Sequence, residues 1–372
     1  MTDFSQSVTP GVQGLKPYEP GKPLSELERE YGITQAIKLA SNENPLGPSP
    51  RAVAAAQVAL SEVHRYPDGN GFALKQALAQ KFNWLPTQIS LGNGSNDVLE
   101  FIARAFLGPG CNAVFSQYAF AVYAIVTQAA GAASKIVPAL PKNASQPYGH
   151  DGQALAATID EHTRVVFIAN PNNPTGTWMS VTELEHLLKR IPADVIVVID
   201  EAYAEYIQTP DYPDTSRWLT TYPNLIVAHT FSKAYGLAGL RVGYAVASPE
   251  ITHLINRVRQ PFNVNSVALA AAEAALNDNV HLSRSIDVNR AGLKQLGDGL
   301  NSLGLFFIPS QGNFLCFQVT PPPRVVYEQL LRLGVIIRPV DNYGLKEFLR
   351  VSVGTQAENK RFLTSLAEVL QS

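Results

Sequence analysis

The chain has few charged residues, few cysteines and no long apolar run, and each scarcity excludes a class of protein. Charged residues make up 16% of the 372 residues and the formal net charge is −2, so we expect no general attraction to nucleic acid or to an anionic membrane. Two cysteines, Cys111 and Cys316, are too few for a disulfide framework and fit a reducing compartment. No apolar run approaches the roughly 18 residues of a membrane helix. The first residues, MTDFSQSVTP, lack the pattern of a secretory signal, so a soluble cytoplasmic protein is predicted.

Apolar runs rich in β-forming residues alternate with helical patterns through the middle of the chain. Hydrophobic residues make up 46% of the sequence, enough for a sizeable core. The runs that predict strands are VVFIAN (165–170), DVIVVID (194–200), NLIVAHTFS (224–232) and VGYAVAS (242–248). Between the first two, SVTELEHLLKRI has helical spacing and a capping-box pattern from Ser180 to Glu183. Strands of this kind, connected by helices, predict an α/β fold with a mostly parallel central sheet covered by helices.

The composition changes near each end of this region, which predicts three parts. Residues 1–44 include GLKPYEPGKP, rich in proline and glycine, and we expect an extended N-terminal arm and part of a smaller domain. Residues 45–260 form the large domain. Residues 261–372 form a smaller α+β C-terminal domain, in which the helical SVALAAAEAAL precedes NFLCFQV, GVIIRPV and FLRVSVG.

Polar motifs follow four of the predicted strands. The carboxyl ends of the strands of such a sheet are where ligands bind. TQISLGNGSNDVLEF reads as a strand, a glycine turn and a helix, whose free N–H groups suit a phosphate, with Ser95 adding a hydroxyl. The other three strands end in NPNNPTG, in DEAY and in SK. Each of the four motifs also has an ordinary interpretation. These are a turn without a ligand, an asparagine-proline turn, a helix cap at Asp200 and a solvated lysine. Their coincidence at one sheet edge predicts a binding site.

Pyridoxal phosphate is the ligand that needs all of these groups together. A lysine amine holds its aldehyde as a Schiff base, and a carboxylate pairs with its pyridinium nitrogen. An asparagine and a tyrosine can bond its ring hydroxyl, and an arginine fork matches its phosphate. In HTFSKAYGLAGLRVGY (229–244), Ser232 and Arg241 would clamp the phosphate while Lys233 reaches the aldehyde. The glycines allow the tight backbone that this arrangement requires.

The sequence resembles the fold-type I, class I/II pyridoxal-phosphate aminotransferases, and within them the histidinol-phosphate aminotransferases most closely. The resemblance covers essentially the whole chain. The motifs that carry it are LKPYEPGKP (15–23), KLASNENPLGPSP (38–50), RYPDGNG (65–71), LGNGSND (91–97), FAVY (120–123), NPNNPTG (170–176), DEAY (200–203), TFSKAYGLAGLRVGY (230–244) and LRVSVGT (349–355). The resemblance implies a fold-type I transferase that acts as a homodimer with shared active sites.

The resemblance also implies a role for each matching cofactor residue. Lys233 is similar to the Schiff-base lysine that carries the proton, and Asp200 to the pyridinium partner. Asn173 and Tyr203 match the ligands of the ring hydroxyl. The residues that match the phosphate shell are Gly94, Ser95, Asn96, Ser232 and Arg241.

The remaining matches concern the ring face, the second subunit and the substrate. Phe120 aligns with the aromatic residue that stacks on the cofactor ring, with Tyr118 as the alternative and core packing as the ordinary reading. Tyr66 is similar to the tyrosine that reaches the neighbouring subunit's phosphate, or it packs at an interface. Arg350 matches the arginine that binds the substrate carboxylate or its counterpart. For a substrate phosphate we expect Arg338, unless it is a solvated strand end.

The implied reaction is transamination from L-histidinol phosphate to 2-oxoglutarate in histidine biosynthesis. It would yield imidazole-acetol phosphate and L-glutamate by ping-pong chemistry, without a metal, and Tyr18 would close the pocket from the arm. The same layout resembles phenylalanine and tyrosine aminotransferases and threonine-phosphate decarboxylases. A noncatalytic regulator that joins this fold to a DNA-binding module is a further alternative, for which we see no spare segment.

Overall fold

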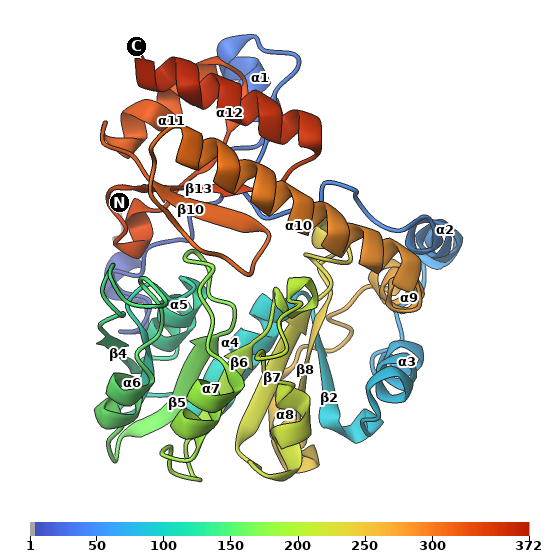
Figure 1. Cartoon of the computed structure of the whole chain (residues 1–372). Coiled ribbons are helices and arrows are strands. Elements are labelled where there is room, and N and C mark those ends of the chain that lie inside the picture. The colour runs from blue at the N-terminus through green and yellow to red at the C-terminus, as the bar shows by residue number, and fades with distance from the viewer. Residues whose placement is uncertain (1–3, 372) are drawn as a thin grey trace.

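A seven-stranded sheet forms the centre of the computed structural model, which describes residues 4–371 (Figure 1). Its strand order is β2-β8-β7-β6-β5-β3-β4. The strands are β2 (Ile89–Gly92), β3 (Asn112–Ser116), β4 (Ala133–Val137), β5 (Thr163–Ala169), β6 (Ile196–Asp200), β7 (Leu225–Thr230) and β8 (Gly243–Ala247). Strands β3 to β7 pair in parallel, whereas β8 runs antiparallel to both β7 and β2. The mostly parallel sheet is therefore confirmed.

Strand β8 is the antiparallel member of the mostly parallel sheet. Residues 231–242 connect β7 to β8 and hold only the 3₁₀ turn η6 (Ala238–Leu240). A parallel return needs a crossover of a dozen or more residues, usually a helix. Because the connection contains no helix that could carry the chain back across the sheet, the chain turns at the carboxyl edge and keeps its motif there.

Helices cover both faces of this sheet, as the near-continuous apolar strands predict. Along β5, Val165 and Phe167 face a cluster with α4 (Ser95–Phe106), α5 (Val122–Ala129) and α8 (Pro249–Val258). Val166 and Ile168 face the cluster that includes α6 (Gly152–Thr158), α7 (Val181–Leu188) and the 3₁₀ helix η5 (Thr215–Thr220). The predicted capping box at the start of α7 is confirmed: Ser180 Oγ accepts from Glu183 N at 3.3 Å, and Ser180 N donates to Glu183 Oε2 at 2.8 Å.

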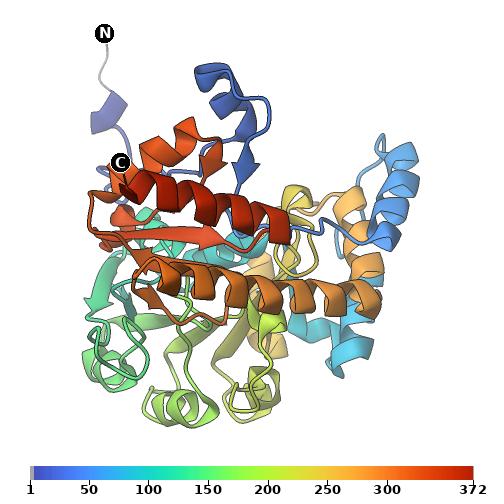
Figure 2. The same ribbon diagram turned by 45° about the horizontal axis from the view of Figure 1, so that its top comes forward.

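A four-stranded antiparallel sheet follows in the C-terminal part of the chain, in the order β12-β13-β10-β9. It comprises β9 (Phe307–Ile308), β10 (Phe314–Gln318), β12 (Arg338–Pro339) and β13 (Phe348–Ser352). The helices of this part are α10 (Asn279–Ser302), α11 (Pro323–Arg332) and α12 (Gln356–Gln371). Figure 2 shows α10 and α12 running side by side, and apolar residues of all three helices pack with β10 and β13.

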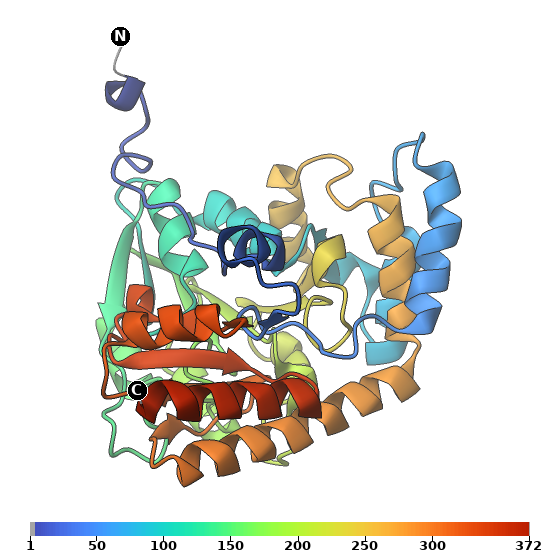
Figure 3. The same ribbon diagram turned by 90° about the horizontal axis from the view of Figure 1, so that it is seen from above.

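The N-terminal segment joins this second part. Residues 15–23 have neither helix nor strand, and they lead to α1 (Leu24–Tyr31). Strand β1 (Ile37–Lys38) then pairs in parallel with β11 (Val335–Ile336). Figure 3 shows this dark-blue segment crossing from the outer end of the chain to the middle of the molecule. The remaining 3₁₀ turns are η1 (Phe4–Gln6), η2 (Leu60–Glu62), η3 (Pro86–Gln88), η4 (Ala204–Tyr206) and η7 (Asp341–Tyr343).

Three helices form a separate layer beside β2 and β8. Helix α9 (Ser266–Leu276) packs against α2 (Pro50–Ala59) and α3 (Phe72–Phe82) (Figure 1). A helix from the expected C-terminal part therefore contacts elements of the expected large domain, and the domain boundary at residue 260 stays a prediction. Within residues 4–371, no helix is both long and apolar enough to span a bilayer.

Gly243 on β8 lets the backbone of this strand come close to the start of α4 and to β7. A Cβ added at Gly243 would lie 2.5 Å from Ser95 N, 2.8 Å from Gly94 C and 2.8 Å from His229 O, all backbone atoms that cannot move alone. We predict that Gly243→Ala lowers the free energy of unfolding by about 1–3 kcal/mol through overpacking. The measurement is urea unfolding of the purified variant.

The matched control is Gly108→Ala, because an added Cβ at Gly108 meets nothing within 4 Å. The free energy of unfolding of this variant should stay within about 0.5 kcal/mol of the wild type. Equal urea midpoints for Gly243→Ala and the wild type would show that the close contact between β8 and the start of α4 is not needed for stability.

Candidate active site

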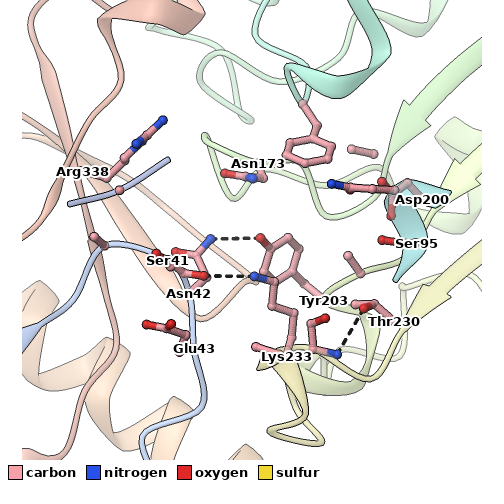
Figure 4. Close-up of a pocket in the computed structure, with 18 of the residues that line it drawn as sticks. Ser41, Asn42, Glu43, Ser95, Asn173, Asp200, Tyr203, Thr230, Lys233 and Arg338 are labelled. Carbon is pink, nitrogen blue, oxygen red and sulfur yellow. Dashed lines mark hydrogen bonds between the residues drawn. The ribbon is translucent and has the colours of Figure 1, made fainter. Parts of the chain in front are cut away.

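A cavity of about 270 Å³ lies where the carboxyl edge of the central sheet meets the N-terminal segment and strands β12 and β13 (Figure 4). Most of the residues that the sequence singles out line it together. They are Tyr18, Ser95, Asn96, Phe120, Asn173, Asp200, Tyr203, Ser232, Lys233, Arg241, Arg338 and Arg350. Their roles stay predictions, but they share one cavity although they are spread over more than 300 positions of the chain.

Lys233 follows β7 and points into this cavity. Its Nζ donates to the carbonyl oxygen of Ser41 at 3.0 Å, a contact drawn in Figure 4. Burial, together with the positive charge of Arg350, lowers the pKa of Lys233 to about 8. The neutral amine, which is the nucleophilic form, is therefore accessible near neutral pH.

Asp200 is the last residue of β6 and has one unused carboxylate oxygen. Its Oδ2 accepts from the Tyr123 hydroxyl at 2.9 Å, whereas the buried Oδ1 has no hydrogen-bond partner. Burial raises the pKa of Asp200 to about 6, and the hydrogen bond from Tyr123 opposes that shift. A buried acceptor without a donor is costly, so Oδ1 is suited to an N–H group of a ligand.

Tyr123 was missed by the sequence reasoning, which gave a role only to Phe120 within FAVY. It is fully buried, and its ring stacks on Phe167 with centroids 4.8 Å apart. Burial raises the pKa of the Tyr123 hydroxyl well above its usual range, so the group stays a neutral donor to Asp200. The available signal in the sequence was that Tyr123 ends the matching motif FAVY.

The first turn of α4 and the β7–β8 connection form one end of the cavity. Gly94, with φ of +86°, precedes α4, and a Cβ there would lie 2.3 Å from Arg241 Nη2. Gly94 therefore lets the arginine reach the helix start, although Gly94 itself does not line the cavity. Arg241 Nη1 donates to Ser232 Oγ at 3.3 Å. A guanidinium, hydroxyls and a free helix N-terminus form a site for a phosphate.

Two arginines occupy the other end of the cavity, side by side on antiparallel strands. Arg338 of β12 and Arg350 of β13 are register partners, and both are buried, with 7% and 5% of their surface exposed. Arg350 Nη1 donates to Asn173 Oδ1, and its Nη2 donates to the Ala40 carbonyl at 2.6 Å. Arg338 Nη2 donates to the Glu19 carbonyl, and its guanidinium lies 5.8 Å from the centroid of the Tyr18 ring.

No carboxylate of residues 4–371 forms an ion pair with either arginine. Like charges directly opposite one another on paired strands are destabilising, and a buried charge without a counterion costs more than an exposed one. The pair is consequently suited to bind anions.

The segment after β1 supplies two residues that the sequence reasoning left without a role, and β7 supplies a third. Ser41 accepts from Lys233, as described above, and Asn42 Nδ2 donates to the Tyr203 hydroxyl at 2.9 Å. Burial raises the pKa of Tyr203 to about 12, so the phenol stays protonated. Thr230 at the end of β7 also lines the cavity, and its Oγ1 accepts from Ser232 N at 3.1 Å. The SNEN run of the matching motif was the available signal for Asn42.

Phe120 and Tyr118, the two alternatives for the cofactor ring face, lie in different places. Phe120 lines the cavity. Tyr118 packs edge-on against Tyr148 at 5.8 Å between ring centroids, in a cluster under β10 and β13. The geometry therefore favours Phe120 for the ring face.

Tyr66 lies outside the cavity. It is 83% exposed and stacks on Phe262 with ring centroids 4.8 Å apart. Within the chain it thus has no part in the cavity, so any role at a cofactor requires a second copy of the chain.

The residues present fit pyridoxal phosphate. The unpaired Asp200 Oδ1 matches a pyridinium N–H, the Lys233 amine matches an aldehyde, and the helix start with Arg241 matches a phosphate. The cavity volume of about 270 Å³ lies near the lower end of the range of small-molecule sites, roughly 300–1,000 Å³.

Comparisons with known proteins agree with this geometry. Histidinol-phosphate aminotransferase 2 of Pseudomonas fluorescens strain Pf-5 is 56% identical over 370 residues, which are 99% of this chain and 98% of that protein. The Pseudomonas aeruginosa protein of the same name is 55% identical, with 100% and 99% covered. The crystal structure of histidinol-phosphate aminotransferase from Sinorhizobium meliloti in complex with pyridoxal-5'-phosphate has a TM-score of 0.88 at 28% identity, with 98% and 97% covered.

The model of the family described as aminotransferase class I and II matches residues 34–366. That range contains every cavity residue named above except Tyr18. The chain therefore belongs to the class I and II aminotransferases and is a pyridoxal-phosphate-dependent enzyme with the fold-type I architecture.

Proposed function

We propose that this aminotransferase transfers the amino group of L-histidinol phosphate to 2-oxoglutarate. The products are imidazole-acetol phosphate and L-glutamate, formed in two half-reactions as a step of histidine biosynthesis. The observation that carries the proposal is the buried pair Arg338 and Arg350, which lacks any ion-pair partner in the described chain. Histidinol phosphate brings one distal anion and 2-oxoglutarate brings two carboxylates, so a pair of cations serves both substrates. The names of the similar Pseudomonas proteins support the same donor.

Four residues would hold the cofactor ring. Asp200 Oδ1 would accept from the pyridinium N–H, because this oxygen has no donor in the chain. Asn173 Oδ1 accepts from Arg350 Nη1. The side-chain amide N–H of Asn173 can therefore donate to the ring hydroxyl oxygen. Tyr203 accepts from Asn42, so its own O–H can donate to the same oxygen. Phe120 would cover the ring face. When bound, pyridoxal phosphate supplies an electron sink that acidifies the donor Cα–H.

Lys233 is the proposed proton carrier. Its Nζ takes the proton from the donor Cα, which requires the neutral amine. Burial and the charge of Arg350 lower the pKa of Lys233 to about 8, and this shift makes that form available. At the other end, Ser95, Asn96, Ser232 and Arg241 would hold the cofactor phosphate and so fix the distance to Lys233.

The two arginines would bind different groups of the substrate, because they differ in their contacts with Asn173. Arg350 contacts Asn173 and Ala40, so it would bind the substrate group nearest the cofactor. Arg338 lies beside Tyr18 and Glu19 of the arm, so it would bind the distal phosphate of histidinol phosphate, with Tyr18 closing that end.

A homodimer with shared sites completes the proposal. Large apolar side chains are exposed around α2 and the loop that follows it: Val58, Leu60, Val63, Tyr66, Phe72 and Phe262. Exposed apolar side chains gathered in this number are typical of a protein–protein contact, and a second copy of the chain is the common partner. Tyr66 would then reach the cofactor phosphate of the second copy.

The cofactor chemistry is tested with Lys233→Ala. This variant should lose both the covalent link to pyridoxal phosphate and turnover, because no other amine of the cavity can replace Nζ. Absorbance spectra and mass spectrometry after borohydride reduction measure the link. The control is Lys81→Ala, which removes a lysine that also has a lowered pKa from burial but lies outside the cavity; this variant should keep the link.

The rate at which cofactor-free enzyme captures pyridoxal phosphate should rise with pH and level off above about 8, because only neutral Lys233 reacts. Arg350→Ala should move the midpoint to higher pH, since a nearby positive charge disfavours the ammonium form. A pH-independent rate, or full transamination by Lys233→Ala, would contradict the assignment.

The donor is tested with Arg338→Ala and Arg350→Ala. Loss of a charge-assisted contact costs roughly 1.5–3 kcal/mol, so kcat/KM of Arg338→Ala for histidinol phosphate should fall about 10- to 150-fold. Any turnover of phenylalanine, which has no distal anion, should survive in Arg338→Ala and collapse in Arg350→Ala. The measurement is each single half-reaction, so that 2-oxoglutarate binding does not contribute. Equal losses on both donors in Arg338→Ala would show that Arg338 is not the phosphate ligand.

A further inference from the structure

The segment between α8 and α9 has an unusual backbone under the exposed Tyr66. Phe262 adopts φ of +57°, a left-handed conformation that is strained for a bulky side chain. In this pose its ring stacks on Tyr66 at 4.8 Å between centroids, with 26° between the planes. A Cβ added to Gly69 would come within 3.3 Å of the Phe262 ring, so the loop of residues 65–71 wraps closely over this ring. Strain of this kind persists where the surrounding structure requires the pose.

Little else in the chain fixes the direction of the Tyr66 ring, because 83% of its surface is exposed. Arg259 fixes the loop beneath it. Arg259 Nη2 donates to the Gly69 carbonyl at 2.8 Å, and its Nη1 donates to Asn263 Oδ1 at 2.9 Å. Segment 259–263 therefore holds the loop by a ring contact and by a hydrogen bond to its backbone.

The base of this segment is tied to the start of α4. Asn263 Nδ2 donates to Asp97 Oδ2 at 2.9 Å and to the Leu91 carbonyl at 3.2 Å. Asp97 Oδ2 also accepts from Asn93 N at 2.8 Å, within the glycine turn that leads to Ser95. The segment thus stands on β2 and α4, which are rigid elements, and extends from them to the loop of Tyr66.

We propose that Phe262 and Arg259 are positioning residues for the active site of a second copy of the chain. They hold Tyr66 in the direction in which its hydroxyl reaches the cofactor phosphate of that copy. This inference rests on the proposed shared-site dimer. It adds that segment 259–263 of the same subunit fixes the orientation of the Tyr66 side chain before the dimer forms.

The first test measures cofactor affinity of the cofactor-free dimer. Phe262→Asn removes the ring but keeps a residue that tolerates the left-handed backbone. Its Kd for pyridoxal phosphate should rise about tenfold, as should that of Tyr66→Phe. The Kd of the double variant should be no higher than that of either single variant. The Kd for pyridoxal, which has no phosphate, should stay at the wild-type value. Phe262→Tyr, which keeps a stacking ring, should restore the affinity for pyridoxal phosphate.

A matched control comes from another stacked pair. Phe82 stacks on Trp84 at 4.6 Å between centroids and does not line the active-site cavity. Phe82→Ala should leave both Kd values unchanged. Additive losses in the double variant, or an equal loss of pyridoxal affinity in Phe262→Asn, would show a general structural role and overturn the proposal.

The second test assigns the effect to a subunit with tagged hybrid dimers. In a hybrid of Lys233→Ala with Phe262→Asn, the single lysine-bearing site takes Tyr66 from the subunit whose Phe262 is intact. That site should show wild-type cofactor affinity and turnover, as should the hybrid of Lys233→Ala with Tyr66→Phe. If only the Tyr66→Phe hybrid is restored, sites are shared but Phe262 acts in its own subunit, and the inference is wrong. If neither hybrid dimer is restored, the proposed shared-site dimer is wrong, and the inference about Phe262 is wrong as well.

Discussion

The structure depends on a set of cations that two sheets bring together in one cavity without an ion-pair partner in the described part of the chain. Lys233, Arg241, Arg338 and Arg350 line one cavity, and none forms an ion pair within 4.0 Å in the described part of the chain. Assembling desolvated positive charges costs free energy, which phosphate and carboxylate groups of ligands can offset. Burial, together with the positive charges of Arg350 and Arg241, lowers the pKa of Lys233 to about 8. Charge placement therefore connects cofactor binding, substrate binding and the reactive amine.

The topology explains how such distant residues meet. The short antiparallel return from β7 to β8 keeps Lys233 and Arg241 at the edge where α4 begins, and Gly243 allows the two backbones to approach. The register of β12 with β13 sets Arg338 beside Arg350. The pairing of β1 with β11 then brings Ser41 and Asn42 over Lys233 and Tyr203. Each device is a backbone constraint, so the site is formed by rigid elements.

The sequence predicts those parts of the site that local patterns determine. Apolar runs define where β6 and β7 end, so Asp200 and Lys233 could be placed at one edge before the structure was known, and the capping box at Ser180 marked the start of α7. The direction of β8 was not predictable from its apolar run, which looks the same in either orientation. Tyr123 and Asn42 were missed because the side chain of each reaches the site by a hydrogen bond with a residue 77 or 161 positions away. For Tyr66 the proposed contact lies on another chain, so its expected role came from the family resemblance alone.

The central claim is that this aminotransferase prefers a donor with a distal phosphate. The most direct measurement compares kcat/KM of the wild-type enzyme for histidinol phosphate and for histidinol, which differ only in the phosphate, with 2-oxoglutarate as acceptor and glutamate as the measured product. A charge-assisted contact of roughly 1.5–3 kcal/mol predicts that histidinol phosphate is favoured by about 10- to 150-fold. Equal values for the two donors, or faster turnover of phenylalanine than of histidinol phosphate, would contradict the account.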